Sequence, residues 1–203
     1  PVTAVATLGK VGDEAVVPVL IQALSDSGLF VREAAANALG RIGSTGAVPA
    51  LIQALSDSSV RIRFASAGAL GAISGTVVVP ALLQALSDSD LAVRIAAAEA
   101  LGKVGSAEVV PTLLRELAYF GSNMRMGAAL ALGEIADATA VPALVKTLSD
   151  MNFGMRWAAA RALGKIGGTA VVPALLHALL DSDFSVREAA ANSLGWIGDA
   201  AAT

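Results

Sequence analysis

The sequence contains no cysteine, which excludes disulfide bonds, thiolate metal ligands and thiol nucleophiles together. Charged residues are also scarce, since Asp, Glu, Lys and Arg make up 15% of the chain, against about 25% in an average domain. Aromatic residues account for only 4%, whereas hydrophobic residues as a whole account for 55%. Much of this apolar content is Ala, Leu and Val, a composition that favours closely packed helices over a large irregular core.

The charge balance limits the partners that the chain can attract. Its net charge is −3, so no global positive field draws nucleic acid or anionic membranes to it. The absence of cysteine fits a reducing compartment, and we expect a cytoplasmic protein.

Residues 64–87 carry no charge, but they include Gly71, Gly75 and Pro80. A repeat explains this stretch better than a membrane span of about 20 apolar residues does.

A period of 31 residues runs through the whole chain. Leu-Gly pairs, prolines and arginines each keep this period: Leu-Gly at 8–9, 39–40, 70–71, 101–102, 132–133, 163–164 and 194–195; Pro at 18, 49, 80, 111, 142 and 173; Arg at 32, 63, 94, 125, 156 and 187. A fixed period of this length indicates a repeat architecture. We predict a single domain over residues 1–203, with a half repeat at 1–12, repeats at 13–43, 44–74, 75–105, 106–136, 137–167 and 168–198, and a tail at 199–203.

Each repeat is predicted to contain two helices. Apolar residues in 48–55 recur at i, i+3, i+4 and i+7, one face of a helix. Pro49 lies in its first turn, where a missing N–H does least harm. Residues 56–58 predict a turn and the N-cap of the next helix, and Gly43 is expected to end the second helix of the preceding repeat. A hairpin this short buries its apolar faces only by stacking on its neighbours.

The segments AVPALIQALSDSSVRIRFASAGALGAI (47–73) and VVPALLQALSDSDLAVRIAAAEALGKVG (78–105) resemble HEAT-like repeats of the phycobilin-lyase type, and the resemblance extends over the whole chain. It implies an all-α, right-handed α-solenoid with first helices on the convex side and second helices on the concave side. Relatives of this kind include lyase subunits, DNA-repair proteins, scaffolds and engineered binders. The resemblance therefore implies a fold and leaves the function open.

Two features that recur in the repeats indicate packing. The arginine of the second helix follows an aspartate by six residues in five pairs: Asp26 and Arg32, Asp57 and Arg63, Asp88 and Arg94, Asp150 and Arg156, Asp181 and Arg187. We interpret them as a ladder between stacked turns rather than as cations aligned for phosphate. Tyr119 replaces the aspartate before Arg125, so we expect Arg125 to be the least sensitive ladder arginine. The Leu-Gly glycine costs a helix about 1 kcal/mol relative to alanine, which indicates close approach of neighbouring helices.

The informative positions are those that vary between repeats. Positions equivalent to 30, 33, 37 and 41 point away from the core stripe of the second helix, and the position equivalent to 29 lies at the start of that helix. Of the eight aromatic residues, Tyr119 and Phe120 lie in one irregular turn and six lie on this variable face. Exposed apolar patches usually mark interaction sites. We predict a partner-binding surface formed by Phe30, Phe64, Ile95, Met126, Phe153, Trp157, Arg161, Phe184 and Trp196. Self-association through these rings, or packing of the rings on one another, are the alternatives.

No constellation for catalysis or metal binding is recognisable. His177 is the only histidine, and it occupies a position held by Gln22, Gln53, Gln84, Arg115 and Lys146 in the other repeats. A metal ligand or general base needs partners that the sequence does not place there. Nucleophile–base pairs and Gly-rich phosphate loops are likewise missing. We expect no enzymatic activity, no metal and no cofactor.

The leading interpretation is a non-catalytic protein-binding scaffold. The resemblance suggests a first alternative, a subunit of a bilin lyase or a chaperone-like chromophore-attachment factor. DNA binding is a second alternative, but a groove that tracks phosphates should be basic. On the variable face, Arg41, Arg61, Lys103, Arg161 and Lys165 are nearly balanced by Glu33, Glu99, Glu134 and Glu188. The sequence therefore disfavours nucleic acid and membranes as partners.

The two ends of the sequence do not look like capping repeats. Residues 1–12 match only a second helix, and residues 199–203 resemble the start of a seventh repeat. A solenoid normally ends in atypical repeats with a polar outer face. We therefore expect a fragment of a longer protein whose uncapped ends favour end-to-end association.

Overall fold

The computed structural model describes residues 2–73, 75–105, 107–119 and 124–201, and every regular element in these ranges is a helix. The first helices of the repeats are α2 (Val17–Ala23), α4 (Val48–Ala54), α6 (Val79–Ala85), α8 (Val110–Ala118), α10 (Val141–Thr147) and α12 (Val172–Ala178). The second helices are α1 (Val2–Val11), α3 (Leu29–Ile42), α5 (Val60–Ile73), α7 (Leu91–Val104), α9 (Arg125–Ile135), α11 (Phe153–Ile166) and α13 (Phe184–Ala201).

Each first helix directly follows a short 3-10 helix of three residues, and its own first turn contains the repeated proline. The 3-10 helices are η1 (Glu14–Val16), η2 (Thr45–Ala47), η3 (Thr76–Val78), η4 (Ala107–Val109), η5 (Ala138–Ala140) and η6 (Thr169–Val171). Proline lacks the N–H that the first turn leaves without a partner in any case.

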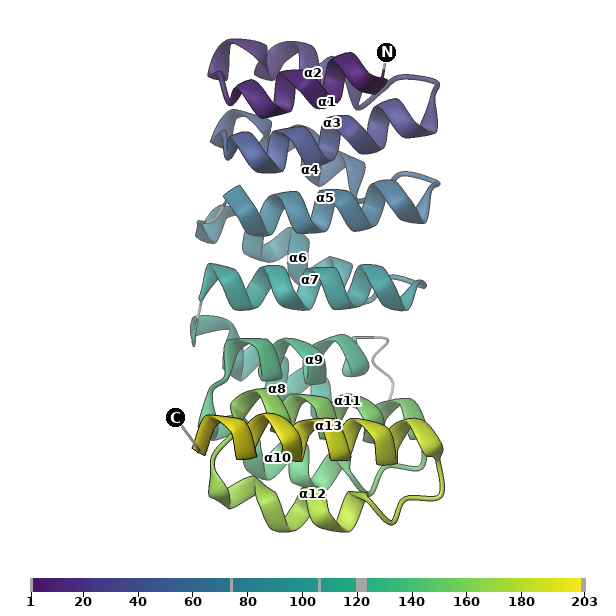
Figure 1. Ribbon diagram of the computed structural model, residues 1–203, viewed down its shortest axis with the longest axis vertical. Helices are drawn as coiled ribbons and strands as arrows, with labels where there is room; N and C mark the ends of the chain where they lie inside the picture. The colour runs from purple at the N-terminus through teal and green to yellow at the C-terminus, as the bar shows by residue number, and fades with distance from the viewer. Residues whose placement is uncertain (1, 74, 106, 120–123, 202–203) are drawn as a thin grey trace. The chain divides into compact units, whose positions relative to one another are not determined.

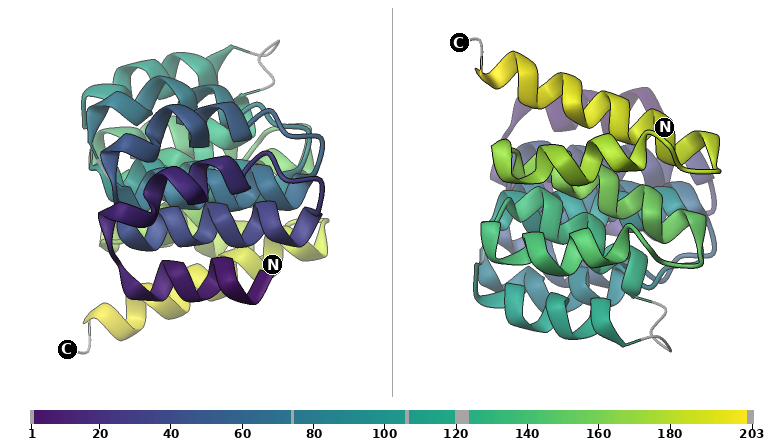
Figure 2. Two further views of the ribbon diagram at one scale, coloured as in Figure 1. Left: turned by 90° about the horizontal axis from the view of Figure 1, so that it is seen from above. Right: turned by 90° about the horizontal axis from the view of Figure 1, so that it is seen from below.

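The chain divides into two compact units, Pro1–Val104 and Gly105–Thr203. In the first unit, α1, α3, α5 and α7 lie in one layer, and α2, α4 and α6 lie in a second layer (Figure 1 and Figure 2). In the second unit, α9, α11 and α13 lie in one layer, and α8, α10 and α12 lie in the other. Each unit is thus a stack of helical hairpins, which confirms the predicted helical-repeat solenoid. One domain over residues 1–203 and a right-handed twist stay predictions.

The helix ends follow the sequence signals with two differences. Gly43 ends α3 in a left-handed conformation (φ 75°), as predicted. The expected N-cap at residues 56–58 is wrong by one position, because α5 begins at Val60 and Asp57 instead accepts a hydrogen bond from the N–H of Ser59 (2.7 Å). The second helix α13 continues to Ala201, past Gly198, at which the last repeat was expected to end. Residues 202–203 of the predicted tail lie outside the described residues.

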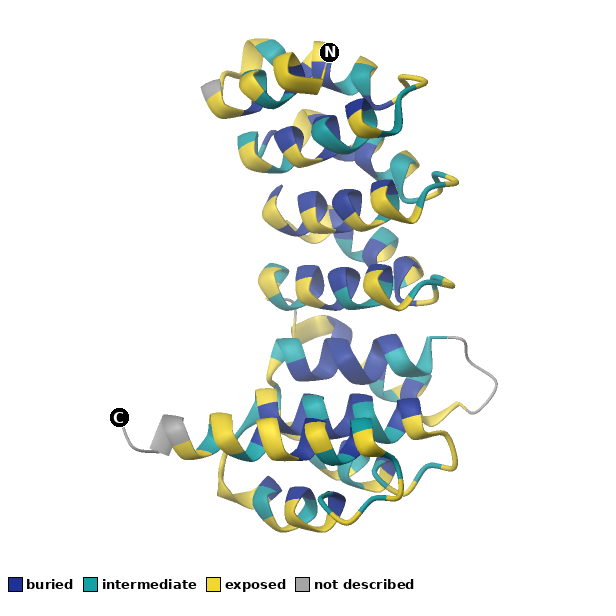
Figure 3. Cartoon of the chain, turned by 45° about the vertical axis from the view of Figure 1, so that its right-hand side comes forward, coloured by how far each residue is buried: buried dark blue, intermediate teal, exposed yellow. Residues whose placement is uncertain are grey.

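The core of each unit lies between the two layers and is aliphatic. The largest fully buried side chains are leucines such as Leu39, Leu70 and Leu163, together with Ile62 (Figure 3). Buried alanines such as Ala69 and Ala100 lie in the narrow contacts between second helices. Among the described residues, no aromatic side chain is buried. This framework therefore packs without the rings.

Successive second helices within a unit approach each other closely at the glycines of five Leu-Gly pairs. A Cβ built on Gly71 would lie 2.6 Å from the Cβ and 2.7 Å from the Cα of Ala100, which is 29 residues later on the next second helix. The same contact joins Gly9 with Ala38, Gly40 with Ala69, Gly133 with Ala162 and Gly164 with Ser193. The predicted close approach is confirmed, and it explains why a residue with low helix propensity recurs in the middle of a helix.

Two glycines of α5 give a matched test of this contact. Gly71→Ala should lower the free energy of unfolding by about 1–3 kcal/mol, because the added methyl group overlaps the backbone of α7. Gly68→Ala should raise it by about 0.5–1 kcal/mol, because Gly68 lies in the same helix and a Cβ there would meet no atom within 4 Å. Urea denaturation followed by circular dichroism measures both. Equal effects of the same sign would contradict the contact.

Candidate protein-interaction surface

The repeated arginines lie in the first turn of the second helices. Four of them join their own turn to the turn of the next repeat: Arg32, Arg63, Arg125 and Arg156. Arg63 donates through Nε and Nη2 to the two carboxylate oxygens of Asp88, at 2.7 and 3.0 Å. Its Nη1 donates to the backbone carbonyl of Asp57 at 3.0 Å. The carboxylate partner is therefore the aspartate 25 residues later, in the next repeat, and the aspartate six residues earlier contributes its carbonyl. Arg32 pairs with Asp57, and Arg156 with Asp181, in the same way.

This geometry corrects the expectation for Arg125. Its Nη2 donates to Asp150 at 2.5 Å and its Nε donates to the carbonyl of Leu117 at 3.1 Å. The replacement of an aspartate by Tyr119 therefore does not remove the carboxylate partner of Arg125. Sequence spacing within one repeat suggested the wrong partner, because the stacked turn of the next repeat lies nearer to the guanidinium.

The ion pairs are largely withdrawn from solvent, with 13% of the Arg63 side chain and 11% of the Asp88 side chain exposed. A hydrogen bond from Arg156 lowers the pKa of Asp181. For Asp88, burial acts to raise the pKa, but hydrogen bonds from Arg63 and the N–H of Asp90 outweigh it and leave the pKa lowered. The same arginines and aspartates thus stabilise the turns in every repeat where they occur, so we propose that they have a structural role.

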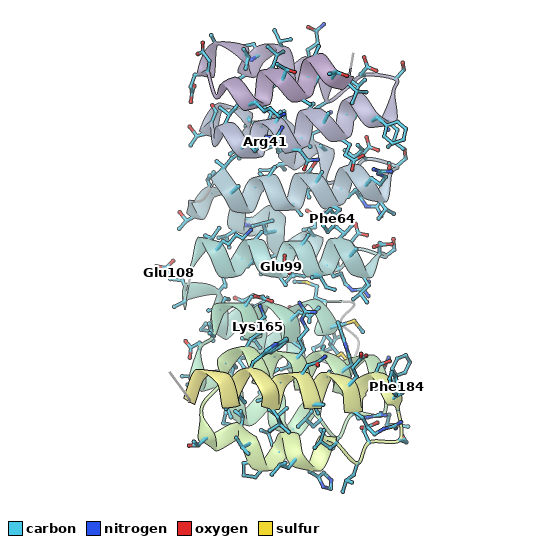
Figure 4. The ribbon with its side chains drawn as sticks, viewed as in Figure 1. Arg41, Phe64, Glu99, Glu108, Lys165 and Phe184 are labelled. Atoms are coloured by element: carbon cyan, nitrogen blue, oxygen red, sulfur yellow. The ribbon has the colours of Figure 1, made fainter. Side chains whose placement is uncertain are left out.

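The variable face of the first unit carries exposed rings and charges. Phe30 and Phe64 are 57% and 48% exposed. The guanidinium of Arg61, on α5, lies 5.2 Å from the ring centroid of Phe30, on α3, and pairs with Glu33 at 2.8 Å. Ile95 is half-buried on α7. Figure 4 labels Arg41, Phe64 and Glu99 on the three successive helices of this face.

The variable face of the second unit is richer in aromatic residues. Phe153, Phe184 and Trp196 are exposed, and Figure 4 labels Phe184 at the start of α13. Trp157 is half-buried, with the guanidinium of Arg161 5.9 Å from its ring centroid.

Three of the nine predicted binding residues on the two faces are half-buried apolar side chains: Ile95, Met126 and Trp157. A Cβ built on Gly154 would lie 2.6 Å from the methyl carbon of Met126, so Met126 packs against the first turn of α11. The predicted surface is therefore a set of exposed rings beside partly covered apolar side chains.

One residue departs from the sequence interpretation of the variable face. Leu130 occupies a position equivalent to 37 and was expected to point away from the core, but it is buried. The equivalent position holds polar residues such as Asn37 and Glu99 in other repeats. The apolar side chain of Leu130 was therefore the sequence signal that could have predicted its burial. In the irregular turn, Tyr119 is exposed and Phe120 lies outside the described residues.

An open pocket of about 790 Å³ lies at the carboxyl end of α11 in the second unit. Its lining includes Lys165, Gly167, Gly168 and Trp196. The ammonium group of Lys165 lies 3.2 Å from Glu134 on α9. The pocket therefore adds an indole ring, a cation and exposed backbone to the same side of the unit as the aromatic residues.

His177 is exposed on α12, and within the described ranges no three His, Cys, Asp or Glu side chains gather in a way that could hold a metal ion. Of the helices in those ranges, none combines the length and the hydropathy that a membrane crossing requires.

The fold defines the chain as an α-helical repeat protein, and comparison with known families gives the particular kind. Residues 2–71, 48–119 and 121–195 match the family model for HEAT repeats, so the chain belongs to the HEAT-repeat family. This confirms the resemblance inferred from the repeated segments. A search of curated proteins gives no significant match.

Solved structures support the same fold. The complex of CpcE and CpcF of phycocyanin lyase from Nostoc sp. PCC7120 matches with 28% identity and a TM-score of 0.59, over 90% of this chain and 77% of that chain. YibA of Escherichia coli matches with 24% identity and a TM-score of 0.58, over 95% of this chain and 73% of that chain. The similarity to YibA supports the fold alone.

Neighbouring arginines of α5 test the role of the turns. Arg63→Ala should lower the free energy of unfolding at pH 7 by about 2–3 kcal/mol, because it leaves the Asp88 carboxylate without its charged donor. Arg61→Ala, which removes an exposed pair with Glu33, should cost about 0–1 kcal/mol. Similar losses from both variants, measured by urea denaturation, would count against the ladder.

The same pair predicts the pH dependence. The pKa of Asp88 is lower in the folded than in the unfolded chain, so its contribution is present above the unfolded pKa. That contribution should disappear as pH falls from about 5 toward the lowered folded pKa. The Arg63→Ala variant should therefore lose less stability over this pH range than the wild type does.

Proposed function

We propose that the chain is a non-catalytic protein-binding scaffold and that the second-helix faces of its units hold the partner. The observation that carries the proposal is the separation of aliphatic and aromatic residues: leucine and alanine fill the core, whereas Phe30, Phe64, Phe153, Phe184 and Trp196 are exposed on second helices. Aromatic residues are enriched in the energetic centres of interfaces. The cytoplasm, inferred from the lack of cysteine, is the proposed compartment.

The kind of relative supports a protein partner. The similar Nostoc structure is a complex of two chains, CpcE and CpcF, and it matches this chain over most of its length. A helical-repeat chain presents a broad surface that a second macromolecule can cover. If the partner is a second copy of this chain, the same rings would mediate self-association.

The proposal is tested by capture from a lysate of the source cells, with proteins quantified by mass spectrometry. Phe64→Ala combined with Trp157→Ala should lose at least 90% of a protein that the wild type captures, because two apolar anchors are removed. A matched control, Val77→Ala with Leu180→Ala, truncates exposed side chains outside the second helices and should retain capture.

Thermal unfolding of the same variants completes the test. The Phe64 and Trp157 variant should keep its helicity and unfold within a few degrees of the wild type. A loss of several kcal/mol of stability would place these rings in the core. If the Phe64 and Trp157 variant captured the partner as well as the wild type does, the second-helix faces would not be the binding surface.

A second candidate function is a bilin-lyase subunit or a chromophore-attachment factor. Two observations favour it: the similarity to phycocyanin lyase, and the pocket lined by Trp196 and Lys165. A ring and a cation suit a planar ligand that bears carboxylates. Titration with a bilin, followed by visible absorbance, tests it. A spectral shift that Trp196→Ala abolishes would support this candidate, and an unchanged spectrum would exclude it.

A further inference from the structure

One row of positions on the first unit carries cations on three of its four second helices. The row is formed by Lys10 on α1, Arg41 on α3 and Lys103 on α7, with Ala72 at the equivalent position of α5; we call it the cation row. All four residues are exposed. None of the ion pairs found among the described residues involves a member of the row, whereas Arg61 and Lys165 on the variable faces are each paired with a glutamate.

The charge of the row opposes that of its surroundings. Residues 1–104 contain seven Lys and Arg residues and eight Asp and Glu residues. Most of these acids lie in the turns, and Asp57 and Asp88 are held there by arginines. Of the two acids on the variable face, Glu33 is paired with Arg61, and Glu99 lies one helical turn before Lys103. A positive strip thus crosses a unit that is slightly acidic as a whole.

An apolar surface lies next to the row. On α5, Phe64, Gly68 and Ala72 follow one another at intervals of four residues, and all three are exposed. A Cβ on Gly68 would meet no atom within 4 Å, so a partner chain can approach the backbone of α5 there. Figure 4 labels Arg41 near the carboxyl end of α3 and Phe64 nearer the amino end of α5, the next second helix. The strip therefore combines separate cations with a shallow apolar surface at Gly68 and Ala72, on the helix between Arg41 and Lys103.

We propose that the cation row binds an extended acidic segment of a partner protein, which crosses the second helices of the first unit with an apolar residue over Gly68 and Ala72. The proposal rests on the protein-binding function of this face. Packed helices lie about 8–10 Å apart, and an extended chain advances about 3.3 Å per residue. Two carboxylates about three residues apart along the segment would therefore match Lys10 and Arg41, and a third about six residues further on would match Lys103, with an apolar residue between them over Ala72.

Nucleic acid fits this surface less well than an acidic polypeptide. A phosphate backbone needs a continuous basic track, but Ala72 interrupts the row and Phe64 and Glu99 border it. Cations near the carboxyl end of a helix also stabilise that helix by interacting with its dipole. If this were the only role of the three cations, replacing them would not change peptide binding. The effect of the replacements on binding therefore distinguishes helix stabilisation from the proposal.

The test uses three fluorescein-labelled peptides of twelve residues and the whole chain, with binding followed by anisotropy. The first peptide is Glu-Val-Thr-Glu-Val-Thr-Val-Val-Thr-Glu-Val-Thr, which has a valine at the position that would meet Ala72 and β-branched residues that favour an extended chain. The second has lysine in place of each glutamate, and the third has the composition of the first with its glutamates clustered at one end. A labelled single-stranded DNA of twelve nucleotides is the fourth probe.

The wild type should bind the spaced acidic peptide at least tenfold more tightly than the lysine peptide and the clustered peptide, and added salt should weaken the binding. Arg41→Glu with Lys103→Glu should reverse the preference between acidic and basic peptides. Arg115→Glu with Lys146→Glu makes the same change in net charge on exposed positions of the first helices α8 and α10, and it should retain the wild-type preference. Circular dichroism verifies folding of both variants.

Several results would overturn the proposal. In the first, the spaced acidic peptide does not bind at all, or both double variants lose its binding equally. In the second, the clustered peptide binds as tightly as the spaced one. In the third, the DNA binds more tightly than the acidic peptide, and that binding is abolished in the Arg41 and Lys103 variant. The lysate capture separates this proposal from the broader function. A partner that needs Phe64 and Trp157 but is retained by the Arg41 and Lys103 variant would leave the scaffold function intact and remove the cation row from it.

Discussion

The close approach of successive second helices within each unit determines most of what the rest of the structure can be. A glycine in one helix faces an alanine or serine of the next, as with Gly71 and Ala100 or Gly164 and Ser193. Helices this close leave room between them only for small and aliphatic side chains. Large rings are therefore excluded from the core, and on the second helices the rings of Phe30, Phe64, Phe153, Phe184 and Trp196 are exposed.

The same spacing brings the turns of consecutive repeats into contact. It lets Arg63 reach across to Asp88 while it also holds the carbonyl of Asp57. A guanidinium suits this role because its donors diverge in a fixed plane and satisfy a carboxylate and a carbonyl together. Residues that repeat thus serve stacking, which leaves the residues that vary as the part of the chain that selection can adapt to a partner.

That division explains how a chain with a net charge of −3 can present local positive charge. Its acids are concentrated in the turns, where arginines and backbone N–H groups hold Asp57, Asp88 and Asp181. The ends of the second helices are free to differ, and in the first unit they carry Arg41 and Lys103. Charge on such a surface contributes specificity and association rate more than affinity, and the neighbouring rings contribute affinity.

The sequence by itself determined the repeat, the two helices of each hairpin and the membership of the aliphatic core, because a strict period fixes which positions face a neighbour. It also indicated the close contact at Leu-Gly, since a recurring glycine in a helix requires a reason. Only the tertiary structure decided which aspartate pairs with arginines such as Arg63 and Arg125, and that Leu130 is buried. Both depend on contacts between residues of different repeats, and the distance across a stack is set by packing that spacing within one repeat does not contain.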